Sequence, residues 1–117
     1  MTHDEQEIRD LIQRWADDIV MFDVPPPHRG VRGIAAYRET WPGFFTWQAG
    51  GADFAIDTLE VTAGADVAFA HALLLCGTRE QHEAVPERRL RLTLGLRKEG
   101  GRWIVAHEHH SFPLETG

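Results

Sequence analysis

The apolar positions near the start of the chain repeat with the period of a helix. Five of them fall on one helical face: Ile8, Leu11, Ile12, Trp15 and Ile19. Thr2 and Glu5 have the spacing of a capping box. The pattern predicts an amphipathic helix over about residues 3–17 with one buried side. The bulky apolar run at 19–23 indicates a short strand, which ends before the prolines at 25–27 because proline cannot donate to a sheet.

A second helical pattern follows a glycine-containing link at residues 29–33. Its apolar face would hold Ile34, Tyr37, Trp41 and either Phe44 or Phe45. Pro42 lies inside this pattern, so we expect the helix to break or restart there. Gly50 and Gly51 would then end the segment. Aromatic residues at such spacing usually lie in a core, and we expect most of these to do so.

From residue 53 the apolar positions alternate with period two, as in strands. The pattern predicts four consecutive antiparallel strands, with turns at 63–66 and 98–101 and a polar loop at 79–87. The phase slips near Asp57, which indicates a bulge. Two amphipathic helices beside such a meander predict an α+β domain, in which N-terminal helices pack on a strongly curved antiparallel sheet.

Length, charge and cysteine content limit the classes of function. A chain of 117 residues is expected to form one domain, over 1–117, with a single core. Its net charge of −6 argues against nucleic-acid binding, which needs a basic face. Cys76 is the single cysteine and is expected to be a small buried hydrophobe. The polar N-terminus and the short apolar runs predict a cytoplasmic protein without membrane contact.

The last predicted strand carries a dense group of titratable side chains. It follows the double glycine at 100–101 and reads RWIVAHEHHSFP. Strand alternation puts His107 and His109 on one face and Glu108 and His110 on the other. A strict two-residue loop would turn the first pair toward the leucines of the preceding strand, whereas a three-residue loop with a glycine bulge would turn the second pair there. The sequence leaves both registers open.

Four segments of the chain are distinctive when taken together. They read IRDLIQRWA, FDVPPPHRGVRG before AYRETW, DVAFAHALL and GGRWIVAHEHHSFP. In combination they resemble the SnoaL-like, ketosteroid-isomerase-homologue group of the nuclear transport factor 2-like superfamily, and they are also similar to the association domain of calcium/calmodulin-dependent kinases. The resemblance implies a cone-shaped, cystatin-like fold, a pocket inside the cone and a homodimer formed through the sheet.

The chain departs from that family pattern in two places. About a dozen or more residues, roughly three helical turns, are missing between RWA and DDIV, where a second helix normally stands. In the true isomerases, an aspartate near the end of the first strand abstracts the proton. The matching position here is Phe22, and the neighbouring Asp23 points the other way.

The resemblance places His110 in the pocket and turns His71 inward. We expect Trp41, His71 and His110 to contact a ligand. Glu108 beside the two histidines would either hold an imidazolium that binds a small anion or form a catalytic acid–base pair with His110. The alternative is that these histidines only satisfy buried hydrogen bonds. No spacing matches a strong metal motif, so neither a metal nor a cofactor is expected.

The expected function is the binding of a small molecule, with ketosteroid-isomerase-like proton transfer as its catalytic form. The alternative, from a different class, is a non-catalytic dimerisation or assembly module. An apolar cavity that receives histidines would favour binding, and a filled cone would favour assembly.

Overall fold

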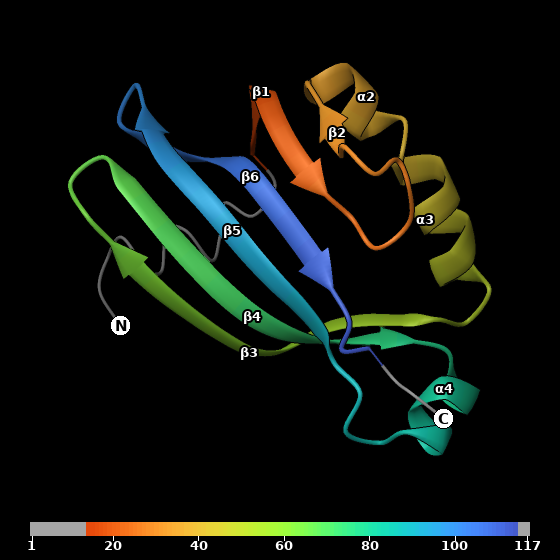
Figure 1. Ribbon diagram of the computed structural model, residues 1–117. Helices are drawn as coiled ribbons and strands as arrows, with labels where there is room; N and C mark the ends of the chain where they lie inside the picture. Colours follow the sequence, from red (N-terminus) through yellow and green to blue (C-terminus); the bar gives the residue numbers. More distant parts are fainter. Residues whose placement is uncertain (1–13, 115–117) are drawn as a thin grey trace.

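One mixed sheet forms the body of the protein (Figure 1). The computed structural model describes residues 14–114. The strands are β1 (Trp15–Phe22), β2 (Val31–Arg32), β3 (Asp53–Ala63), β4 (Val67–Gly77), β5 (Leu90–Glu99) and β6 (Arg102–Ser111). Their order across the sheet is β2-β1-β6-β5-β4-β3, and every neighbouring pair is antiparallel except β1 with β6. The predicted meander is therefore confirmed.

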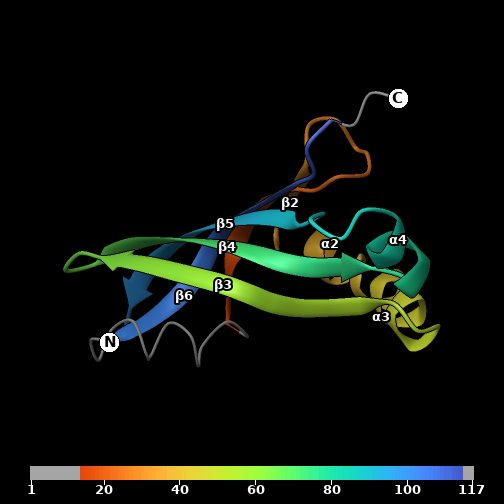
Figure 2. The same ribbon diagram turned by 90° about the horizontal axis from the view of Figure 1, so that it is seen from below.

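Three short helices complete the described part of the chain: α2 (Ile34–Arg38), α3 (Trp41–Ala49) and α4 (Arg79–Ala84). Figure 2 shows them gathered toward the same end of the long strands β3 and β4. The predicted break at Pro42 is confirmed, because α2 ends before it and a new helix starts with proline in its first turn. No helix among residues 14–114 is long and apolar enough to cross a membrane.

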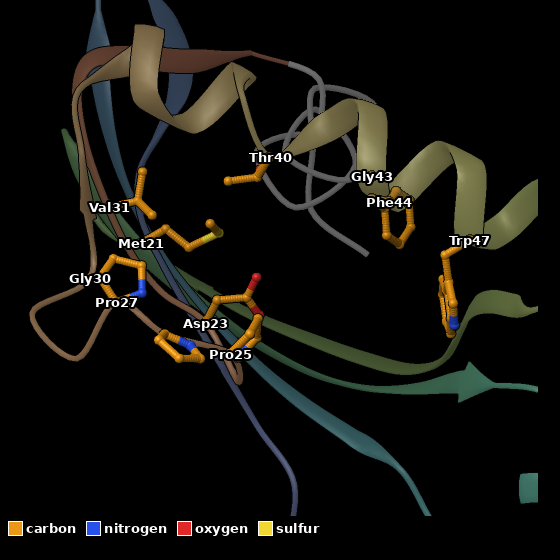
Figure 3. Close-up of a pocket in the computed structure, with 11 residues that line it drawn as sticks. Met21, Asp23, Pro25, Pro27, Gly30, Val31, Thr40, Gly43, Phe44 and Trp47 are labelled. Atoms are coloured by element: carbon orange, nitrogen blue, oxygen red, sulfur yellow. The ribbon is translucent and has the colours of Figure 1, made fainter.

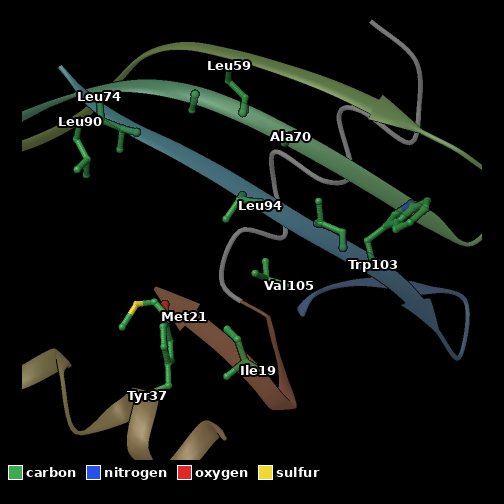
Figure 4. Close-up of a cluster of buried hydrophobic side chains, with 12 residues drawn as sticks. Ile19, Met21, Tyr37, Leu59, Ala70, Leu74, Leu90, Leu94, Trp103 and Val105 are labelled. Carbon is green, nitrogen blue, oxygen red and sulfur yellow. The ribbon is translucent and has the colours of Figure 1, made fainter. Parts of the chain in front are cut away.

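The core lies on the face of the sheet that carries alternate residues of β1, β4, β5 and β6 (Figure 4). Its buried members are Ile19, Met21, Tyr37, Leu59, Ala70, Ala72, Leu74, Leu90, Leu94, Leu96, Trp103 and Val105. Trp103 and Ile19 are completely buried. We call this side of the sheet the inner face and the opposite side the outer face.

A bulge in β6 decides which titratable residues reach the inner face. Glu99 pairs with Arg102, so the hairpin has the strict two-residue loop, and Leu96 pairs with Val105. The next pair on β5 is Gly95 with His107, which leaves Ala106 as an extra residue. The parity of the strand therefore changes in its middle. The two-residue loop of the first predicted register is confirmed. The orientation of Glu108 and His110 toward the leucines, which the second register predicted, is also confirmed, but the bulge in mid-strand causes it.

Two predictions of secondary structure are wrong in part. The helix expected over 3–17 lies mostly outside the described residues, but its last residues belong to β1, because the Val105 amide donates to the carbonyl of Arg14 and Trp15 pairs with Val105. The polar loop expected at 79–87 contains α4. A capping box between Thr78 and Gln81 stabilises this short helix. The bulge predicted near Asp57 is confirmed.

Candidate functional site

Glu108 is a charged residue in the interior, with only 8% of its surface exposed. The bulge in β6 brings it to the inner face, where it pairs with Leu94. Its Oε1 accepts hydrogen bonds from Trp15 Nε1 at 3.0 Å and from the Tyr37 hydroxyl at 2.8 Å. Its Oε2 lies 3.2 Å from Nε2 of His110. Three donors thus converge on one carboxylate, which offsets the loss of water around a buried charge.

His110 lies between two carboxylates. Its Nε2 contacts Glu108 and its Nδ1 lies 3.3 Å from Oδ1 of Asp23. Burial by itself lowers the pKa of this imidazole, but the hydrogen bonds with Asp23 and Glu108 outweigh it and raise the pKa to about 9. At neutral pH His110 is therefore an imidazolium that donates from both nitrogens.

Asp23 completes this row directly after β1. Burial raises the pKa of its carboxyl group, but the hydrogen bonds from His110 and from the Val24 amide lower this pKa by a larger amount. The pKa of Asp23 is therefore below its ordinary value. Ile19 and Met21 are buried on the inner face, and strand alternation continues that face to Asp23. Phe22 points to the outer face, where its ring contacts His107 and His109.

Asp23 belongs to this network and to the wall of a pocket described below, and the sequence pattern did not single it out. The sequence places it on the side opposite to Phe22, but the family resemblance matches Phe22 to the aspartate of the isomerases. The alternation of Ile19, Met21 and Asp23 along the strand could have predicted its position, because it puts the carboxylate on the same side as the buried core residues. Trp15 and Tyr37, which hold Glu108, were also expected only as apolar core residues.

A pocket of about 350 Å³ opens beside Asp23 (Figure 3). The end of β1, the loop to β2, β2 itself and helix α3 supply its wall. The lining residues are Met21, Asp23, Pro25, Pro26, Pro27, Gly30, Val31, Thr40, Gly43, Phe44 and Trp47. Asp23 is the ionisable side chain among these residues. As far as the described residues line it, the pocket is therefore mainly apolar with one acidic group in its wall.

Aromatic rings hold the network on the side of the helices. The ring of Trp15 lies 5.1 Å from that of Trp41 and 5.7 Å from that of Tyr37, measured between centroids. Burial and the charge of Glu108 both raise the pKa of the Tyr37 hydroxyl, so it stays protonated and remains a donor. Trp41 thus packs against the residues that hold Glu108, and it does not belong to the lining of the pocket.

The structure brings together only part of the predicted site. Glu108 and His110 lie side by side on the inner face, as expected for a pair. The inward orientation predicted for His71 is wrong: its side chain is 58% exposed on the outer face and lies 3.3 Å from Glu60. It lies between Ala70 and Ala72, which occupy the inner face. Cys76 is partly buried, and burial raises the pKa of its thiol.

Solved structures similar to this chain share its fold. A nuclear transport factor 2-like protein of unknown function from Pseudomonas putida is 34% identical, with a TM-score of 0.74 over 95% of this chain and 76% of that one. A nuclear transport factor 2-like protein with a cystatin-like fold from Novosphingobium aromaticivorans is 17% identical, with a TM-score of 0.72 over 97% and 84% of the two chains. A candidate ketosteroid isomerase from Shewanella frigidimarina is 14% identical, with a TM-score of 0.65 over 92% and 90%.

The two more distant likenesses concern the fold alone, because both identities are low. No curated protein matches the chain. The family model of the SnoaL-like domain matches residues 2–115, nearly the full length. Together with the relative from Pseudomonas putida, this match identifies the family: the chain belongs to the SnoaL-like domains of the nuclear transport factor 2-like fold.

Proposed function

We propose that this protein binds a small organic molecule in the pocket beside Asp23. The observation that carries the proposal is the combination of an apolar pocket of about 350 Å³ with a single carboxylate in its wall. Small-molecule sites typically have such a lining, in which one or a few polar groups orient the ligand. The volume lies at the lower end of the range of about 300–1,000 Å³ for such sites.

Of the three polar residues, Asp23 is the proposed ligand contact, and Glu108 and His110 are the proposed positioning residues. Both oxygens of Glu108 and both ring nitrogens of His110 are already engaged in the network. Asp23 alone among these three lines the pocket. Any proton transfer to a ligand would therefore pass through Asp23, with His110 holding its carboxylate in place.

The ionisation of the network favours binding over proton abstraction. A general base works best when its pKa lies near the working pH. The pKa of Asp23 is lowered, which makes it a weak base, and His110 is protonated at neutral pH. We therefore propose ligand binding as the primary function. In place of the predicted acid–base role, we propose that Glu108 and His110 keep the carboxylate of Asp23 in position.

A filled pocket provides the test. Gly43 lies in the pocket wall on α3, and apart from its own helix backbone and its chain neighbours no atom of residues 14–114 lies within 4 Å of the position that its Cβ would take. Gly43→Leu should therefore fill the pocket without disturbing the helix. Thr46→Leu, at an exposed position on the same helix, is the matched control.

The probe is the neutral, fluorescent 2-naphthylmethanol. We expect saturable binding by the wild type and by Thr46→Leu, and affinity lower by about tenfold or more for Gly43→Leu. Equal affinities for all three proteins would show that the dye binds elsewhere, and the pocket proposal would then fail.

A second candidate function is assembly with another copy of the chain. Val67, Phe69 and Leu73 are large apolar residues exposed on the outer face of β4. Exposed apolar residues gathered on one sheet face are typical of protein interfaces. We propose that this face joins two copies, and Phe69→Glu tests it: the wild type should have the mass of a dimer in native mass spectrometry and the variant that of a monomer. A monomeric wild type would contradict the proposal.

A further inference from the structure

We propose that the ligand of this pocket is an organic cation, with an apolar body and a protonated amine that binds the carboxylate of Asp23. The inference rests on the proposed ligand-binding function and adds the chemical class of the ligand. It is based on three features of the site: the balance of charge, the free side of one carboxylate and the aromatic wall opposite.

The charge balance at the pocket is negative. Among residues 14–114, the lining contains neither lysine nor arginine nor histidine, and Asp23 is its ionisable group. Behind Asp23 lie the imidazolium of His110 and the carboxylate of Glu108. Within the described part of the chain, these one positive and two negative groups leave one net negative charge in a partly buried place. A cationic ligand would neutralise that charge, whereas an anionic ligand would add a second uncompensated negative charge to it.

The carboxylate of Asp23 has one oxygen left for a ligand. Its Oδ1 accepts from the Val24 amide at 2.7 Å and faces Nδ1 of His110 at 3.3 Å. Over the described residues, no hydrogen bond or ion pair is made by Oδ2. Figure 3 shows this side chain directed into the space between Met21 and helix α3. A protonated amine placed there would form a charge-assisted hydrogen bond with Oδ2.

The opposite wall suits the body of such a ligand. Phe44 and Trp47 of α3 line the pocket across from Asp23 (Figure 3). Aromatic faces bind apolar rings and also attract cations through their negative quadrupole. The loop with prolines 25–27 adds apolar surface without charge. The pocket thus combines an acidic group and aromatic surfaces, which is a common arrangement for amine ligands.

The test compares three probes with the same aromatic body: 2-naphthylmethylamine, 2-naphthylmethanol and 2-naphthoate. Their affinities are measured by fluorescence or calorimetry at pH about 7, where the amine is protonated. For the wild type, we expect the amine to bind about tenfold or more tightly than the alcohol, and the naphthoate to bind most weakly.

Asp23→Asn supplies the matched variant, because it keeps the shape and one acceptor oxygen but removes the charge. It should bring the affinity for the amine to within about threefold of that for the alcohol, because the charge-assisted hydrogen bond is lost. The wild type supplies a measurement that does not depend on how the variant folds. Its preference for the amine should shrink in about 0.5 M salt, because salt screens the interaction of partly exposed charges.

The outcomes separate the two proposals. If the alcohol binds in a manner sensitive to Gly43→Leu but the amine binds no more tightly, the pocket proposal stands and the cation inference is wrong. Tightest binding by the naphthoate would also overturn it. An amine preference that survives both Asp23→Asn and high salt would show that the charge of Asp23 is not its source. If none of the probes saturates by about 10 mM, both proposals fail.

Discussion

The imidazolium of His110 should make the stability of this protein depend on pH in the alkaline range. Its pKa is about 9 in the folded protein against an ordinary value of 6.5. Because the folded state binds the proton more tightly, the stabilisation is complete below about pH 6.5 and is lost as the pH rises through about 9. The difference between the two pKa values, at about 1.4 kcal/mol per pH unit, corresponds to roughly 3 kcal/mol. His110 is largely buried, so solvent screens this contribution only a little.

The assay is urea denaturation of the wild type and of His110→Gln at several values between pH about 6 and about 10. The wild type should lose roughly 3 kcal/mol more than the variant over this range, since the glutamine does not titrate. His71→Gln is the control. His71 also lies beside a carboxylate, that of Glu60, but it is exposed, and this variant should keep the pH dependence of the wild type. Parallel pH profiles for the wild type and His110→Gln would refute the reasoning.

Three further predictions concern the same network and the loop beside it. Asp23→Asn should lower the pKa of His110 below about 9, because only Glu108 would remain as a charged partner, and histidine NMR titration measures this directly. Tyr37→Phe should reduce the free energy of unfolding by about 1–2 kcal/mol, since Glu108 Oε1 keeps only the donor from Trp15; urea denaturation that shows no change would contradict it. Gly30→Ala should destabilise by about 2 kcal/mol or more, because its φ is 81° and a Cβ would lie 2.5 Å from the ring of Phe22. The helical control Gly43→Ala should stabilise by about 0.5–1 kcal/mol in the same thermal or urea unfolding experiment.

Periodicity in the sequence predicted most of the elements, though not β2 or α4, and it did not predict every face. Alternation predicted the meander from Asp53 onward, and proline predicted the restart of the helix at Pro42, because both signals are local. The start of β1 was missed because Trp15 also fits the helical repeat, and its pairing with β6 depends on contacts far away in the chain. The order of elements therefore comes from local pattern, and some boundaries come from tertiary pairing.

The candidate site shows the limit of sequence reasoning more sharply. Either a hairpin loop with one more residue or a bulge in mid-strand moves Glu108 and His110 of β6 to the other face. The sequence around Ala106 does not indicate which of the two occurs. The family resemblance predicts that His71 faces the inside of the fold. The alternation of His71 with Ala70 and Ala72 is compatible with either face. Small alanines fill the inner face there, so the imidazole points outward to Glu60.

The run of His107, Glu108, His109 and His110 is one feature in the sequence and two in the structure. The inner pair, Glu108 and His110, reaches Asp23 because β1 and β6 run parallel and in contact, with Met21 opposite Glu108. The outer pair instead packs on Phe22, and the Nδ1 of His107 lies 2.6 Å from the Val20 carbonyl. A shift of one residue in either strand would exchange the two pairs. The acidity of the pocket therefore depends on the register of β1 against a bulged β6, and any relative that lacks this bulge should present different chemistry in the same fold.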